Sequence, residues 1–152
     1  MNKLLTLCFA IMMSCTGTTA QKSGNMQSKS EILASESNGG TEKVGFKLIK
    51  NQEELKKEIT QNFAAAGMEP LMVIPSFPND KKVVLYNLGR FNSGDHTIRE
   101  IKSLSVQDNV LYVEVPMYES GGMEIQVLSN PWFIFTVPSS YKFTSVQLKP
   151  TK

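Results

Sequence analysis

The chain has 152 residues, of which 20% are charged and 41% are hydrophobic, a composition typical of a globular protein in water. Its formal net charge is only +2, and its basic residues are clustered no more densely than the pairs at 56–57 and 81–82. A surface for nucleic acid or anionic lipid normally needs a concentrated patch of Lys and Arg. Composition therefore gives no support for a nucleic-acid partner.

The N-terminus has the pattern of an export signal. Lys3 supplies a positive charge, and residues 4–13 form an apolar run that contains a single threonine. A run of this length fits the hydrophobic region of a secretory signal and is too short to span a bilayer as a helix. We predict a signal peptide over residues 1–14, with residues 1–20 as the alternative.

These two boundaries imply different fates for Cys15. The sequence MMSC at residues 12–15 resembles a lipobox, in which Cys15 would be lipidated and become the mature N-terminus. The alternative is cleavage after Ala20, which ends a small-x-small site. The first case predicts a lipid-anchored envelope protein, at the outer membrane or the periplasmic face, and the second a secreted or soluble periplasmic one. Either cut leaves the domain itself without a thiol for a disulfide, a metal or a nucleophile.

The next segment is polar and lacks aromatic residues. Residues 16–43 are rich in Ser, Thr, Gly, Asn and Gln, and such a segment buries too little apolar surface to offset its loss of conformational entropy. We predict a flexible polar tether over residues 15–43, followed by a β-rich domain over residues 44–150.

One helix is expected near the start of this domain, after a short alternating strand at residues 44–49. Asn51 is placed to cap it, and Glu54 stands three residues later, as in a capping box. Gly67 is a suitable stop signal. One apolar stripe repeats every four residues and is expected to pack on a sheet: Leu55, Ile59 and Phe63.

The rest of the chain reads as short strands separated by turns rich in Gly, Asn, Asp and Pro. The expected strands cover residues 83–88, 97–106, 111–115, 125–127, 132–137 and 141–148. The strand at 97–106 has apolar residues at every third position, a spacing that a bulge near Arg99 and Glu100 would reconcile with a buried face. The fold class predicted is mainly β with one N-terminal helix, as an antiparallel sandwich or barrel-like domain.

The sequence shows no recognisable catalytic constellation. His96 is the only histidine, in a polar turn where a side chain is usually solvated, and it has no cysteine partner for a metal site. No nucleophile elbow and no phosphate-binding glycine loop before a helix is present. We therefore predict no enzyme activity, no metal and no cofactor.

Candidate binding residues lie in three loops, at 89–96, 119–123 and 129–132, which combine Gly, Asn or Pro with an aromatic residue or Met. Loops on a rigid β scaffold commonly carry recognition. Trp132 opens the most apolar strand, so a core position is the stronger expectation for its ring. The candidate partner-binding residues are Asn92, Ser93, Gly94, Gly121, Gly122 and Trp132.

Several short motifs resemble the PrcB C-terminal domain family of bacterial envelope proteins, over the region from Phe46 to Leu148. They are Asn51-Gln52-Glu53-Glu54-Leu55, Val83-Val84-Leu85-Tyr86 running into Gly89, Ser93-Gly94, Ile98 with Ile101, and Asn130-Pro131-Trp132. The family's turn is typically Thr-Gly-Gly followed by Tyr, where this chain has Ser93-Gly94-Asp95 followed by His96. The resemblance implies an exported, non-catalytic accessory protein that associates with and stabilises a cell-surface protease complex. The family has no established active site to transfer.

A second resemblance is to chagasin-like inhibitors of cysteine proteases, which present three loops to the enzyme. Asn92-Ser93-Gly94, Ser120-Gly121-Gly122 and Asn130-Pro131-Trp132 follow the same order as those loops. This implies a protease inhibitor as the alternative function. A structural envelope protein without a discrete partner is a third alternative.

Overall fold

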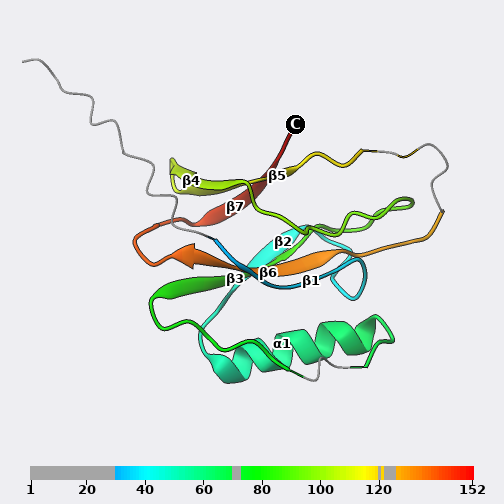
Figure 1. Ribbon diagram of the computed structural model, residues 1–152, viewed down its shortest axis with the longest axis horizontal. Helices are drawn as coiled ribbons and strands as arrows, with labels where there is room; N and C mark the ends of the chain where they lie inside the picture. Colours follow the sequence, from blue (N-terminus) through cyan, green and yellow to red (C-terminus); the bar gives the residue numbers. More distant parts are fainter. Residues whose placement is uncertain (1–29, 70–72, 120, 122–125) are drawn as a thin grey trace, which may run out of the picture.

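The structure is a computed structural model that describes residues 30–69, 73–119, 121 and 126–152. Figure 1 shows the arrangement of its helix and strands in space. The elements are β1 (Ile32–Glu36), β2 (Gly45–Ile49), α1 (Gln52–Ala65), β3 (Lys81–Asn87), β4 (Ser103–Gln107), β5 (Val110–Pro116), β6 (Trp132–Pro138) and β7 (Ser145–Thr151).

The strands form two sheets, and the helix adds a third layer. One sheet has the order β1-β6-β3-β2 with antiparallel pairing throughout, and the other has the order β4-β5-β7. Figure 1 shows α1 on one side of the four-stranded sheet and the three-stranded sheet on the other. The prediction of a mainly β sandwich with one helix is confirmed. The sheets do not close into a barrel in the described residues, and β5 and β7 pair in parallel rather than antiparallel.

The helix begins as its sequence predicts. The side chain of Asn51 accepts a hydrogen bond from the backbone N–H of Glu54 at 2.9 Å. The carboxylate of Glu54 accepts in turn from the N–H of Lys50, also at 2.9 Å, so two N–H groups at this end are paired. Gly67 follows the helix at φ +71°, a conformation that glycine adopts without steric cost. The predicted apolar stripe is buried: Leu55, Ile59 and Phe63.

Strands β3 and β6 are buried on both faces and separate two apolar cores. Val83 and Leu85 pack towards the helix, whereas Val84 and Tyr86 pack towards the three-stranded sheet. This alternation follows from the two-residue period of a strand. Because every side chain in the middle of β3 is apolar or aromatic, this strand contributes buried side chains to both cores.

Strand β1 corrects the predicted domain boundary. It lies within the expected tether of residues 15–43, yet it pairs antiparallel with β6 along the edge of the four-stranded sheet. Ala34 belongs to the helix-side core, and the backbone N–H of Glu31 donates to the hydroxyl of Thr136 at 2.9 Å. The tether prediction was therefore wrong for residues 32–36, and the folded domain begins before residue 44.

Three predicted strands differ from the structure. The strand expected at 141–148 begins and ends later, as β7 at Ser145–Thr151. Regular pairing in the expected strand at 97–106 starts only with β4 at Ser103, and residues 97–102 have no regular secondary structure. Residues 126–128, which overlap the strand expected at 125–127, are also irregular, and Val127 is exposed. Ile98 and Ile101 pack against the core between the two sheets from the first of these irregular segments, whereas Val127 lies at the surface.

Several predictions concern residues outside the described ranges: the signal peptide, the lipidated Cys15 and the candidate residue Gly122. In the part of the chain that is described, no helix is both long enough and apolar enough to cross a membrane.

Candidate functional site

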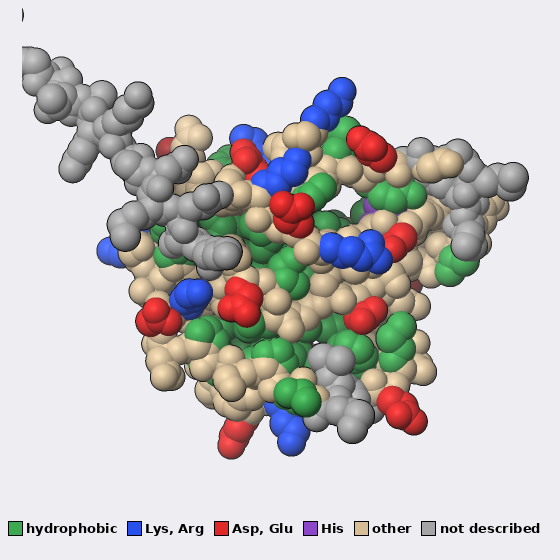
Figure 2. Space-filling model, in the orientation of Figure 1, with side chains coloured by type: hydrophobic (Ala, Val, Ile, Leu, Met, Phe, Trp, Pro, Cys, Tyr) green, Lys and Arg blue, Asp and Glu red, His purple; other side chains and the backbone are tan. Residues whose placement is uncertain are grey.

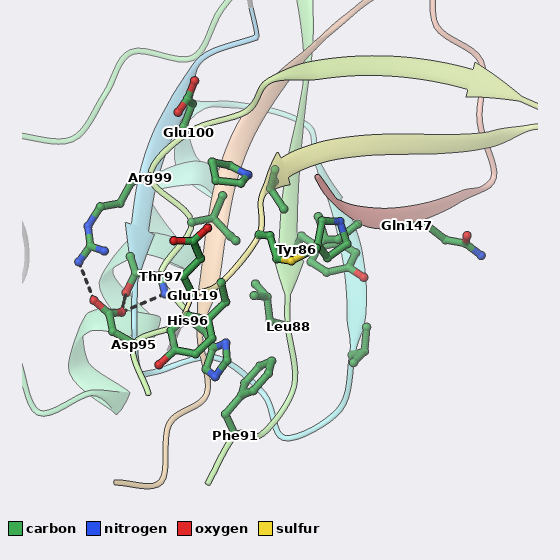
Figure 3. A pocket seen from close by; sticks show the side chains of 18 residues that line it. Tyr86, Leu88, Phe91, Asp95, His96, Thr97, Arg99, Glu100, Glu119 and Gln147 are labelled. Carbon is green, nitrogen blue, oxygen red and sulfur yellow. Dashed lines mark hydrogen bonds and ion pairs between the residues drawn. The ribbon is translucent and has the colours of Figure 1, made fainter. Parts of the chain in front are cut away.

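A cavity of about 760 Å³ lies between strands of the two sheets and the loops that follow β3 and β5. Its walls come from the end of β3 and the loop after it, from the end of β5, and from β7. Figure 2 shows the surface hollowed beside the only histidine side chain, and Figure 3 shows the lining residues. The apolar part of the wall includes Leu88, Phe91, Ile98, Val115, Met117 and Leu148.

The loop after β3 is anchored by backbone hydrogen bonds to the segment that precedes β6. Phe91 and Ser129 exchange two of them, at 2.9 and 3.0 Å. The N–H of Leu88 donates to the carbonyl oxygen of Pro131 at 2.9 Å. These bonds hold the loop against the four-stranded sheet, so that its following turn can form one wall of the cavity.

His96 lies between two aromatic rings at this wall. Its ring centroid is 3.8 Å from that of Phe91, with the planes 22° apart, and 4.2 Å from that of Tyr118. Nε2 of His96 donates to the carbonyl oxygen of Ser93 at 3.0 Å, because a carbonyl can only accept. The expectation that this histidine is simply solvated was wrong, because the ring is half-buried in a stack that joins the loop to the residues after β5.

Asp95 ties the next turn together and points away from His96 (Figure 3). Its carboxylate accepts from the N–H of Thr97 at 3.0 Å and from the Thr97 hydroxyl, and it forms an ion pair with Arg99 at 2.7 Å. The bond from the Thr97 hydroxyl and then that from Arg99 lower the pKa of Asp95 to about 2. Asp95 is therefore a carboxylate at neutral pH, and it neutralises the guanidinium beside it.

Tyr86 forms part of the opposite wall (Figure 3) and is almost fully buried, with 6% of its surface exposed. Its hydroxyl has no hydrogen-bond partner among the residues that the structure describes, and the oxygen is not among the fully buried unpaired atoms, so it opens onto the cavity. Burial raises the pKa of this phenol, so it stays protonated well above neutral pH. An uncharged hydroxyl is thus available inside a largely apolar cavity.

The candidate residues from the first loop lie next to this cavity. The carbonyl of Ser93 fixes His96, and Gly94 lies directly against Tyr118. Asn92 is exposed at the tip of the same turn. Gly121 is also exposed, and a side chain added there would meet no atom within 4 Å, so the structure gives it no contact with the first loop.

Trp132 is a correction to the candidate set. None of its surface is exposed, and it lies in the core between the helix and the four-stranded sheet. Its ring packs edge-on against Phe63 with centroids 5.8 Å apart, and its indole N–H donates to the carbonyl oxygen of Asn38 at 2.9 Å. The expected core position is confirmed. Trp132 cannot contact a partner in this fold.

Sequence reasoning missed part of the cavity. Phe91, His96 and Glu119 lie within loops that were expected to bind, but Tyr86 was assigned only to a buried strand and Tyr118 to no site. A tyrosine in an otherwise apolar strand was the available signal, because its hydroxyl needs a partner or an opening. Nothing in the sequence indicated that residues of β7 line the cavity, because this depends on which strand of the other sheet lies opposite β3.

In the described residues, no group of three His, Cys, Asp or Glu side chains is placed to hold a metal ion. The arrangement offers an apolar enclosure with a few polar groups, which is the composition of a binding pocket. Comparisons with protein-family models, with curated proteins and with solved structures found no match to this chain.

Proposed function

We propose that this protein is a non-catalytic binding module and that the cavity between its sheets is the binding site. The observation that carries the proposal is the construction of the cavity wall. The stack of Phe91, His96 and Tyr118 joins the loop after β3 to the residues after β5 and gives the opening a fixed shape. Pre-formed concave sites of this size, lined mainly by apolar groups, are typical of ligand pockets.

The proposal also includes a location and a class of partner. The protein is exported, is anchored at the cell envelope through lipidated Cys15, and associates with a subunit of a surface protease complex, which it stabilises. The signal-like run at residues 4–13, the lipobox-like sequence before Cys15 and the resemblance to the PrcB family support this part. The inhibitor alternative is less well supported, because it needs Trp132 in an exposed loop and this residue is fully buried.

Site-specific crosslinking in native envelopes tests the binding site and the partner together. A photoreactive amino acid replaces Met117, which is 43% exposed at the cavity, or Lys57, which is exposed on α1 on the other side of the four-stranded sheet. We expect a protease subunit to be recovered from the Met117 position and not from the Lys57 position. Recovery from Lys57 alone would overturn the assignment of the cavity as the binding site.

Two further measurements test the effect on the protease and the lipid anchor. Protease activity of the complex with and without the domain distinguishes a stabilising subunit, whose removal lowers activity, from an inhibitor, whose removal raises it. The Cys15→Ser variant should lose partitioning into the detergent phase while its export continues. Retained partitioning would show that Cys15 is not the lipidated residue.

A further inference from the structure

We propose that the cavity selects ligands that combine an apolar body with a cationic head group, that is, an organic amine or a lysine side chain of an extended peptide. This inference rests on the proposed binding function and specifies the chemistry that the same cavity recognises. It follows from three properties of the lining: apolar walls, an excess of carboxylates and one tyrosine hydroxyl that opens onto the cavity.

The walls provide space and contact for an apolar body. The cavity volume of about 760 Å³ falls within the range of about 300 to 1,000 Å³ that is usual for small-ligand sites. The aromatic side chains Phe91, Tyr118 and Tyr86 all contribute to the lining. Aromatic faces also attract cations through their negative electrostatic potential, so these walls suit a positively charged head group as well as an apolar body.

The charges at the rim are predominantly negative. Four groups of fixed charge line the cavity, and three carboxylates against one guanidinium give a net charge of −2: Asp95, Glu100, Glu119 and Arg99. Asp95 and Arg99 neutralise each other at 2.7 Å. Glu100 and Glu119 form no ion pair with the described residues. The carboxylate of Glu100 is directed away from the cavity in Figure 3, whereas the Glu119 side chain lies among the other lining residues. Glu119 is therefore the acid placed to meet a cation.

The hydroxyl of Tyr86 is an independent indication of a ligand. The residue is more than nine-tenths buried and lines the cavity, and its hydroxyl has no partner among the described residues. Its oxygen is not among the fully buried unpaired atoms, so it opens onto the cavity and is accessible to a ligand. A ligand N–H could donate to this oxygen, which a purely apolar ligand could not do.

Three matched compounds test the charge selection on the complete protein. 4-Phenylbutylamine, 4-phenylbutan-1-ol and 4-phenylbutanoate share one apolar body and differ in the charge of the head group. We expect the amine to bind about fivefold more tightly than the alcohol, which is the effect of one exposed charge contact, and the carboxylate to bind most weakly. Isothermal titration calorimetry gives the dissociation constants, and NMR shifts of the His96 ring locate the ligand. Equal affinity for amine and alcohol, or a preference for the carboxylate, would overturn the inference.

Variants identify the groups responsible. Glu119→Gln keeps the shape of the side chain and should abolish the preference for amine over alcohol, whereas Glu53→Gln on the helix should leave it unchanged. Tyr86→Phe should weaken amine binding about fivefold if one hydrogen bond is lost. Thermal unfolding of each variant confirms that it is folded. An amine preference that survives in Glu119→Gln would show that this carboxylate does not select the charge.

A separate experiment tests whether the natural ligand is a small amine or a lysine side chain of a peptide. Acetyl-Leu-Lys-Leu-amide is compared with the same peptide carrying acetyl-lysine, and tighter binding of the first than of 4-phenylbutylamine assigns the site to peptides. If the alcohol or the carboxylate has the lowest dissociation constant, the proposed binding function is supported but the proposed selection of cations is wrong. If none of the compounds binds and the Met117 position crosslinks nothing, both proposals fail.

Discussion

The hydroxyl oxygen of Tyr118 lies 2.2 Å from the position that a β-carbon on Gly94 would occupy. Gly94 also has φ +81°, in the left-handed region that favours glycine. The aromatic wall of the cavity thus depends on the absence of a side chain at this one position. Any other residue there would have to displace the ring of Tyr118 and adopt a strained backbone at the same time.

Gly94→Ala is expected to destabilise the protein and to disturb the aromatic stack. The left-handed backbone alone costs an alanine about 1 to 2 kcal/mol, and the contact with Tyr118 adds to that. Gly67→Ala is a matched control, because Gly67 has φ +71° but no atom within 4 Å of an added β-carbon. Denaturant unfolding measures both variants. An equal loss of stability in the two would show that the contact with Tyr118 contributes nothing.

The loop at Asp95 is expected to loosen in acid. Its pKa of about 2 lies below the ordinary value, so its hydrogen bonds contribute fully above about pH 4 and are lost as the pH falls through 2. The amide signal of Thr97 should titrate with this midpoint, and Asp95→Asn should abolish the titration. A midpoint near pH 4 would mean that the bonds from Thr97 and Arg99 are not formed in solution.

Trp132→Ala is expected to act on stability and not on a binding surface. The ring is fully buried, and truncation of such a residue costs about 3 to 5 kcal/mol. Trp132→Phe should cost less, because it fills most of the volume and leaves only the carbonyl of Asn38 without its donor. Circular dichroism during chemical unfolding gives both values. Val127→Ala, at a residue that is 55% exposed, should change stability little.

Removal of β1 is expected to disrupt the domain. A protein comprising residues 30–152 should fold, whereas one comprising residues 44–152 should unfold at a much lower temperature or self-associate. The reason is that the latter leaves one edge of β6 without its hydrogen-bond partner and uncovers part of the core around Ala34. Thermal unfolding and size-exclusion chromatography compare the two proteins. Equal stability would restore the predicted boundary at residue 44.

Local patterns in the sequence predict the elements that local interactions determine. The four-residue spacing of Leu55, Ile59 and Phe63 predicts the buried face of α1, and Asn51 predicts its first residue. The apolar run at 132–137 predicts β6 and the burial of Trp132. These features need only the helix and strand periods and the capping preference of one side chain.

The features that were missed depend on contacts between distant parts of the chain. Residues 32–36 contain few large apolar side chains and form a strand because β6, about a hundred residues later, offers them an edge. Ile98 and Ile101 fit no strand period because they pack against the core between the two sheets from a segment without regular secondary structure. The cavity itself is formed by residues of β3, β5 and β7 and of the loops after β3 and β5, so no single segment encodes it.

The place of β6 in its sheet has a consequence for the synthesis of the protein. This strand lies between β1 and β3 and is the sixth of seven along the chain, so the four-stranded sheet cannot assemble until residues 132–138 have left the ribosome. The three-stranded sheet must wait longer, because β7 ends at Thr151. Everything from β1 to β6 must therefore be released before the first sheet is complete, and neither sheet is completed early in translation.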